Sequence, residues 1–140
     1  MKTRYSQRGL SSIGWLMVIL LAGFFLTLAF KMVPAYVDNI YVTDALKSLR
    51  ELGAGQQGYA GVTDSEVRRH LSGYFNINNV RADAVKSLKV ERKSDRILVN
   101  MNYEVREPLF YNVDVVMRFT NQFDSTRPDE CCKPQDGAAP

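Results

Sequence analysis

The stretch SSIGWLMVILLAGFFLTLAF, residues Ser11 to Phe30, decides the architecture because none of its twenty residues is charged. An α-helix rises about 1.5 Å per residue, so this run reaches roughly 30 Å, the thickness of a bilayer's hydrocarbon core. Eleven of its residues are Leu, Ile, Val or Phe, which favour insertion. A soluble core could also bury such a helix, but a chain this short would struggle to enclose it. Residues 11–30 are therefore predicted to be a transmembrane helix.

The flanks of this run predict its orientation. Lys2, Arg4 and Arg8 precede it without an acidic residue among them, so the positive-inside rule keeps residues 1–10 in the cytoplasm. A cleaved signal peptide also begins with basic residues, but its apolar region is usually about 7–15 residues and ends in a small-x-small site, which Ala29-Phe30-Lys31 does not offer. We expect a single-pass membrane protein with everything after the helix exported.

The charge balance of the exported part argues against nucleic acid as a partner. The chain has 18 basic and 15 acidic residues, and its excess of three equals the three basic residues of the cytoplasmic stub. Residues 31–140 are therefore neutral overall. Binding to nucleic acid needs a clustered basic patch that releases counterions, and only two adjacent basic pairs occur there.

Two amphipathic helices are predicted after the membrane. The first covers residues 36–52, and Pro34 before it would either kink a continuous helix or start a new one. The second begins at Asp64 behind a capping box, Thr63 to Glu66, and ends at residue 74 or 75. The apolar positions of these helices are Val37, Ile40, Tyr41, Ala45, Leu46, Leu49 and Leu52, followed by Val67, Leu71, Tyr74 and Phe75.

The loop between these helices is rich in glycine. Gly53 stands where a helix would take a left-handed cap, and Gly53, Gly55 and Gly58 spell the G-x-G-x-x-G pattern of dinucleotide sites. That pattern must follow a strand and open a helix, whereas here it follows a helix. We therefore expect no cofactor.

A period of two replaces the helical period after residues 76–79. Alternation over residues 97–105 and 113–123, with a shorter strand at Leu88 and Val90, predicts a three-stranded antiparallel meander with turns near residues 93–95 and 107–112. The two helices are the available cover for its apolar face. The predicted fold class is α+β: a single N-terminal transmembrane helix, then two helices packed on the meander over residues 31–125.

The remaining residues, 126–140, are expected to form a flexible tail, since they have several prolines and no apolar periodicity. Cys131 and Cys132 are neighbours, which leaves a vicinal disulfide, intermolecular bridges or free thiols open. One histidine, His70, and two adjacent thiols cannot supply a tetrahedral zinc site, so no metal is expected. His70 is expected to be a surface or half-buried residue.

No catalytic residues are expected, because the carboxylates are distributed over caps, turns and polar strand faces and do not converge. The interpretation from the residues is a non-enzymatic protein. An active site assembled only in three dimensions would make it a periplasmic enzyme instead.

Polar or small residues on a membrane helix are useful where another helix approaches. In this segment they are Ser12, Gly14, Gly23 and Thr27. Gly23 and Thr27 form a small-xxx-small pair, and Gly14, Gly23 and Thr27 are the candidate transmembrane interface. The partner could be another envelope protein or a second copy of the chain.

Two resemblances add to this interpretation. The start Arg8-Gly9-Leu10, a long apolar helix and a helix-then-meander domain resemble a type IV pilin or pseudopilin, whose leader is cut after a glycine, here Gly9. Such subunits usually carry a glutamate five residues into the mature helix, and that position is Gly14 in this chain.

The second resemblance covers nearly the whole chain. The Gln7-Arg8-Gly9 start, Gly23-Phe24-Phe25, residues 31–36 (KMVPAY) and Tyr103-Glu104-Val105 are similar to the proteobacterial inner-membrane family DUF4845. This resemblance implies a bitopic envelope protein of the bacterial inner membrane, with its C-terminal domain in the periplasm, commonly encoded beside signal peptidase I. We therefore expect an accessory or scaffold for an envelope complex, with the signal peptidase or export machinery as the first candidate partner.

Overall fold

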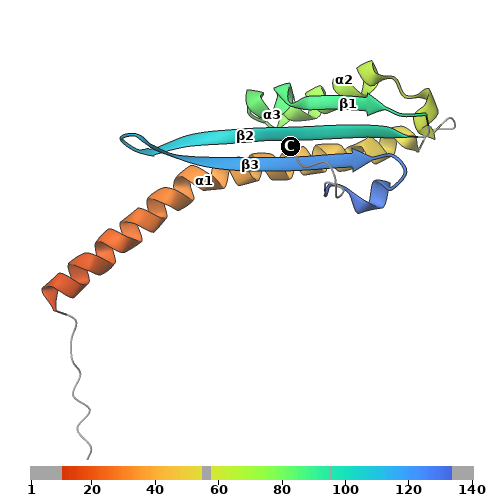
Figure 1. Ribbon diagram of the computed structural model, residues 1–140. Coiled ribbons are helices and arrows are strands. Elements are labelled where there is room, and N and C mark those ends of the chain that lie inside the picture. Colours follow the sequence, from red (N-terminus) through yellow and green to blue (C-terminus); the bar gives the residue numbers. More distant parts are fainter. Residues whose placement is uncertain (1–10, 55–57, 95, 134–140) are drawn as a thin grey trace, which may run out of the picture.

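The computed structural model describes residues 11–54, 58–94 and 96–133. As predicted, it has one long N-terminal apolar helix and a small α+β domain (Figure 1). The stub with Lys2, Arg4, Arg8 and Gly9 lies outside the described residues. The elements are α1 (Ser12–Gly53), η1 (Gly58–Gly61), α2 (Asp64–Ile77), α3 (Ala82–Lys86), β1 (Leu88–Arg92), β2 (Ile97–Phe110), β3 (Val113–Asp124) and η2 (Pro128–Glu130).

The predicted membrane segment and the first domain helix are one continuous helix, α1, of 42 residues. Ser11 caps it through a hydrogen bond from the Gly14 N–H to its side chain. Pro34 lies inside the helix. Proline lacks the N–H that would bond to the preceding turn, and Figure 1 shows α1 bending as it meets the sheet. Of the alternatives left open by Pro34, the structure has the kinked continuous helix.

The apolar first half of α1 protrudes from the domain. The most apolar 18-residue window of α1 has none of its residues buried. Its length and composition fit a single membrane span.

The sheet is the predicted antiparallel meander, with the order β1-β2-β3. Val90 pairs with Val99, and Val99 pairs with Phe123, so three core side chains line up across the sheet. The second half of α1 and helix α2 contact each other and contribute to one hydrophobic core with the inward face of β2 and β3. The opposite face is polar, and Glu104 forms an ion pair with Arg118 across the strands.

The core side of α1 differs from the sequence prediction. Val37 and Ile40 were expected to be core residues, but they are 38% and 56% exposed. Ala35 and Val42 are fully buried in their place, with Ala45, Leu46 and Leu49 as predicted. The pattern has two apolar faces, and the sheet packs against only one of them.

Helix α2 has the predicted capping box, in which Thr63 and Glu66 bond to each other's backbone N–H groups. It extends to Ile77, a little beyond the predicted end, and the short α3 was not predicted. Gly53 is not the left-handed cap that we expected, because the helix ends in a right-handed Ala54. The ring of Tyr59 lies instead against Gly53, where an added Cβ would come within 2.2 Å of it.

The expectation of a loose tail does not hold for residues 126–133. Cys132 is buried, forms a β-bridge with Gln122, and approaches the Thr43 carbonyl oxygen through its sulfur. Asp129 forms an ion pair with Arg50 of α1. This segment therefore packs against α1 and β3, while residues 134–140 lie outside the described residues.

Candidate interaction surface on the long helix

A row of exposed apolar residues runs along α1 on the side away from the sheet. Its members recur at alternating steps of three and four residues, the spacing that holds side chains on one side of a helix and forms coiled-coil seams. We call this row the heptad stripe. It consists of Leu16, Ile19, Gly23, Leu26, Phe30, Val33, Val37 and Ile40, and all eight are exposed.

The last three residues of the heptad stripe are the unusual ones, because they lie beyond the charge-free segment. Val33, Val37 and Ile40 are 55%, 38% and 56% exposed although the domain has folded beside them. The next two positions of the same spacing are Asp44 and Lys47, which form an ion pair at 2.9 Å. The stripe therefore ends at a defined polar boundary about three helical turns above Val33.

The opposite side of α1 holds the domain through buried and half-buried polar contacts. Arg81 binds Asp38 at 3.0 Å and also pairs with Glu107 of β2. Burial raises the pKa of the Asp38 carboxyl, although Arg81 opposes the shift. The Glu107 hydrogen bond raises the pKa of Arg81. This three-residue network fixes the distal half of β2 to α1.

A second network lies beside it. The side-chain oxygen of Asn39 accepts hydrogen bonds from the Tyr103 hydroxyl at 3.2 Å and from Asn121 at 2.7 Å. Burial raises the pKa of Tyr103, so its hydroxyl stays protonated as a donor. Together the two networks set the rotation of α1 on the sheet. They keep the heptad stripe turned outward.

The structure separates the predicted transmembrane interface residues. Gly14 and Gly23 are nine residues apart, about two and a half turns, so they lie on opposite sides of α1. Gly23 belongs to the heptad stripe, and a Cβ added to it would meet nothing within 4 Å. The Thr27 hydroxyl donates to the Gly23 carbonyl oxygen at 2.8 Å, so it already has a partner within its own helix. Gly23 is therefore the position that offers close approach.

Ser48 and His70 have side chains typical of catalysis, and they lie 2.8 Å apart between α1 and α2. The serine hydroxyl has one proton, and it donates this proton to the Ala45 carbonyl oxygen at 2.7 Å. The His70 nitrogen must then donate to the serine oxygen. An activating histidine would accept the proton instead. The pair therefore links the two helices, and His70 is half-buried, as expected.

A polar hollow of about 420 Å³ lies between α1, α2 and η2. Four of its charged groups form two ion pairs, Asp44 with Lys47 and Arg50 with Asp129. Cys131 lines the hollow, and the structure joins it to Cys132 in a disulfide. Within the described ranges, no three His, Cys, Asp or Glu side chains are placed to hold a metal ion.

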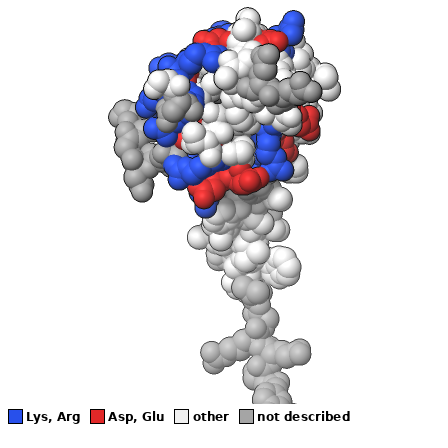
Figure 2. All heavy atoms as spheres, turned by 90° about the vertical axis from the view of Figure 1, so that its right-hand side faces the viewer, with Lys and Arg blue, Asp and Glu red and all other residues white. Residues whose placement is uncertain are grey.

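The surface charges are mixed. On the face shown in Figure 2, basic and acidic side chains are interspersed over the domain, and the helix below it shows no charge in its described part. This view gives no support for a basic nucleic-acid site. In this view the surface of the domain is polar, whereas the described part of the helix below it is apolar.

The second half of α1, α2, α3, β1, β2 and the first part of β3 lie within residues 31–119. Those residues match the family model for a domain of unknown function, DUF4845. No curated protein and no solved structure matches the chain. Because the match covers more than half of the sequence, this protein belongs to the DUF4845 family.

Proposed function

We propose that this protein is a non-enzymatic, single-pass inner-membrane protein whose periplasmic domain and helix α1 dock onto another envelope protein. The observation that carries this proposal is the heptad stripe above the membrane. Val33, Val37 and Ile40 remain exposed although the domain packs against the opposite side of the same helix.

The spacing of the heptad stripe favours a helix as the partner surface. Seams of this spacing pack knobs into holes against a second helix. Fully burying an aliphatic side chain contributes about 1.5–3 kcal/mol, so three exposed positions offer a useful binding surface. Within the membrane, small residues allow two backbones to approach. Gly23 supplies that property in the same row.

The partner is proposed to be an inner-membrane protein with a helix that continues into the periplasm. Signal peptidase I and the export machinery are the first candidates, because the family resemblance implies genetic proximity to signal peptidase I. A second copy of this chain has the same stripe and is the alternative occupant. Lipid contacts the part of the stripe that lies in the bilayer.

Topology is tested first. A reporter that is active only in the periplasm, fused after Pro140, should be active because the basic stub keeps the N-terminus inside. A matched cytoplasmic reporter at that position should be silent. Activity of the cytoplasmic reporter alone would refute both the orientation and the periplasmic location.

Docking is tested by site-specific photocrosslinking in intact membranes. A photoreactive residue at Val37 should capture a partner, which mass spectrometry then identifies. The matched control is Asn102, which is exposed on the sheet face away from the helices. Capture at Asn102 but not at Val37 would contradict the proposal.

A pilin-like subunit is the second candidate function. It is favoured by one observation: α1 protrudes with its apolar half and packs its other half on an antiparallel sheet. The mass of the mature chain separates the two functions. A chain that begins at Leu10 would indicate pilin-type processing, whereas an unprocessed N-terminus favours the docking protein.

A further inference from the structure

The turn between β2 and β3 carries a second group of exposed apolar residues. We call residues 108–113, with the sequence PLFYNV, the hairpin tip. It contains no charge, and Phe110 and Val113 are 51% and 54% exposed, while Tyr111 is fully exposed. Figure 1 shows this end of the hairpin projecting beyond the rest of the domain, on the side where α1 protrudes.

Charged residues lie at the base of the hairpin tip. Lys31, the first charged residue after the membrane segment, donates from its ammonium group to the Pro108 carbonyl oxygen. Pro108 pairs with Asp114 across the strands, and Asp114 lies 3.8 Å from Arg106. Lys31, Asp114 and Arg106 are thus brought to one level along the hairpin. The apolar tip extends past that level.

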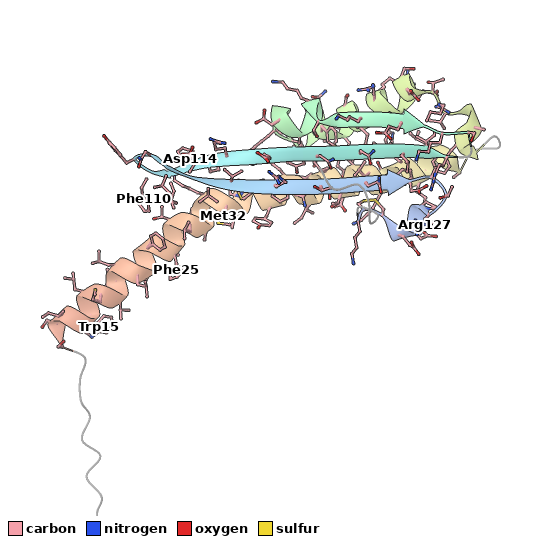
Figure 3. All side chains as sticks on the ribbon, in the orientation of Figure 1. Trp15, Phe25, Met32, Phe110, Asp114 and Arg127 are labelled. Carbon is pink, nitrogen blue, oxygen red and sulfur yellow. A yellow bond between two sulfur atoms is a disulfide. The ribbon has the colours of Figure 1, made fainter. Side chains whose placement is uncertain are left out.

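The hairpin tip contacts the membrane segment directly. The ring of Phe110 stacks on the ring of Phe24, with centroids 6.0 Å apart and planes inclined by 12°. In Figure 3, Phe110 lies on the side of the tip that faces the protruding part of α1. Phe24 and Lys31 are seven residues apart, so both lie on the domain side of α1, away from the heptad stripe.

The backbone of the tip is unusual for an exposed turn. Tyr111 has φ of 39°, a left-handed conformation that turns normally assign to Gly, Asn or Asp. A bulky side chain held there at some conformational cost suggests a role for that side chain. Tyrosine is also a residue enriched at membrane interfaces, where its ring meets apolar chains and its hydroxyl meets water.

We propose that the hairpin tip inserts into the interfacial region of the bilayer leaflet next to the domain, as a second membrane contact besides α1. This inference rests on the proposed membrane anchoring. Lipid is the occupant because the tip adjoins a span residue and begins where the charges end. The cost of burying its backbone is reduced, since Phe110 pairs with Val113, Pro108 has no N–H, and Lys31 satisfies the Pro108 carbonyl oxygen.

A two-point contact with the membrane has a consequence for docking. A single helix lets a domain rotate and tilt above the bilayer. Insertion of the tip on one side of α1 would hold the domain in one orientation, with the heptad stripe facing along the membrane plane on the other side.

Tryptophan quenching tests this proposal on the full-length chain, reconstituted in vesicles of phosphatidylethanolamine and phosphatidylglycerol that contain brominated phospholipid. Trp15 is the one tryptophan of the chain and reports on α1. In a Trp15→Phe background, Tyr111→Trp reports on the tip. Lys93→Trp is the matched control, because Lys93 is exposed near the other end of β2.

We expect bromines near the lipid headgroups to quench the Tyr111→Trp emission more than bromines near the chain ends, and to leave the Lys93→Trp emission unchanged. The Tyr111→Trp emission should also be blue-shifted relative to that of Lys93→Trp. Equal, absent or exclusively deep quenching at position 111 would overturn the insertion. If Trp15 is quenched and position 111 is not, the tip proposal alone fails. If Trp15 is not quenched, the membrane anchor fails.

Discussion

Two faces of α1 beyond Phe30 both carry apolar residues, but only one of these faces is buried. Ala35, Val42 and Leu49 are buried under the sheet, whereas Val37 and Ile40, on the opposite face, remain exposed. A stripe of apolar residues on a helix therefore predicts that something covers it, but does not predict what. In this chain the domain covers one face, and we propose that a partner covers the other.

Leu46→Asp should disrupt the packing of the buried face of α1, and we expect it to have the largest effect. Leu46 is fully buried, and an unpaired carboxylate in a core costs several kcal/mol. The domain should lose its resistance to protease in detergent or membranes. Val99→Asp should behave in the same way from the sheet side, because Val99 is also fully buried. Resistance equal to that of the natural chain in both variants would show that this is not the core.

The sequence was sufficient for the main elements, but not for the short α3 or for the facing of α1. The meander, the capping box of α2 and the long apolar helix each have a local signal, and all three are present. Val37 and Ile40 were assigned to the core because the period of 3.6 identifies apolar positions without choosing between two apolar faces. A heptad row that continues from the membrane segment through Val37 was the signal that could have separated them.

Other features depend on contacts between distant segments. Asp38, Arg81 and Glu107 form one network although they lie in different parts of the chain. The turn was expected over residues 107–112, since proline usually marks a strand end. Strand β2 instead continues through Pro108 to Phe110, because the distal part of β2 pairs on the β3 side and its other edge does not require an N–H. The burial of Cys132 could not be predicted from the sequence, because the residues around it show no apolar periodicity.

Gly53→Ala tests the packing on the buried side of α1 at its C-terminal end. The added Cβ would overlap the Tyr59 ring, and overpacking of this kind costs about 1–3 kcal/mol. Gly73→Ala in α2 is the matched control, because its Cβ would meet nothing within 4 Å, and the change should stabilise the helix by up to about 1 kcal/mol. Urea unfolding should shift in opposite directions for the two variants, and a shared direction would contradict the packing.

Asp124→Asn should remove a pH-dependent contribution to stability from the core end of β3. Burial opposes ionisation of Asp124, but hydrogen bonds from Thr126 and the charge of Arg96 outweigh it and lower the pKa below its ordinary 3.8. The ionised group therefore stabilises the fold above that pH, and this stabilisation is lost as pH falls through the lowered pKa. The variant should be less stable than the natural chain by about 1–3 kcal/mol at pH 7. The difference should shrink in urea titrations below about pH 4, and a gap that widens with acid would have the wrong sign.

Gly23→Leu tests the exposed face of α1 within the proposed membrane span. A leucine there keeps the segment apolar but prevents close approach of a second helix. Association measured by a membrane two-hybrid signal should fall without loss of protein level, while Leu20→Ile should change little. An undiminished signal would limit the docking surface to the part of the heptad stripe above the membrane.

The most direct test of the central claim combines folding and docking in one variant, Ile40→Asp. Because Ile40 is 56% exposed, its replacement should change the free energy of unfolding by no more than about 0.5 kcal/mol. The same replacement places a charge at the end of the proposed seam, one helical turn from Val37, so the partner crosslink from a photoreactive residue at Val37 should be lost. Unchanged folding with a lost crosslink is the result that our account predicts. A domain that unfolds, or a crosslink that persists at its original yield, would contradict it.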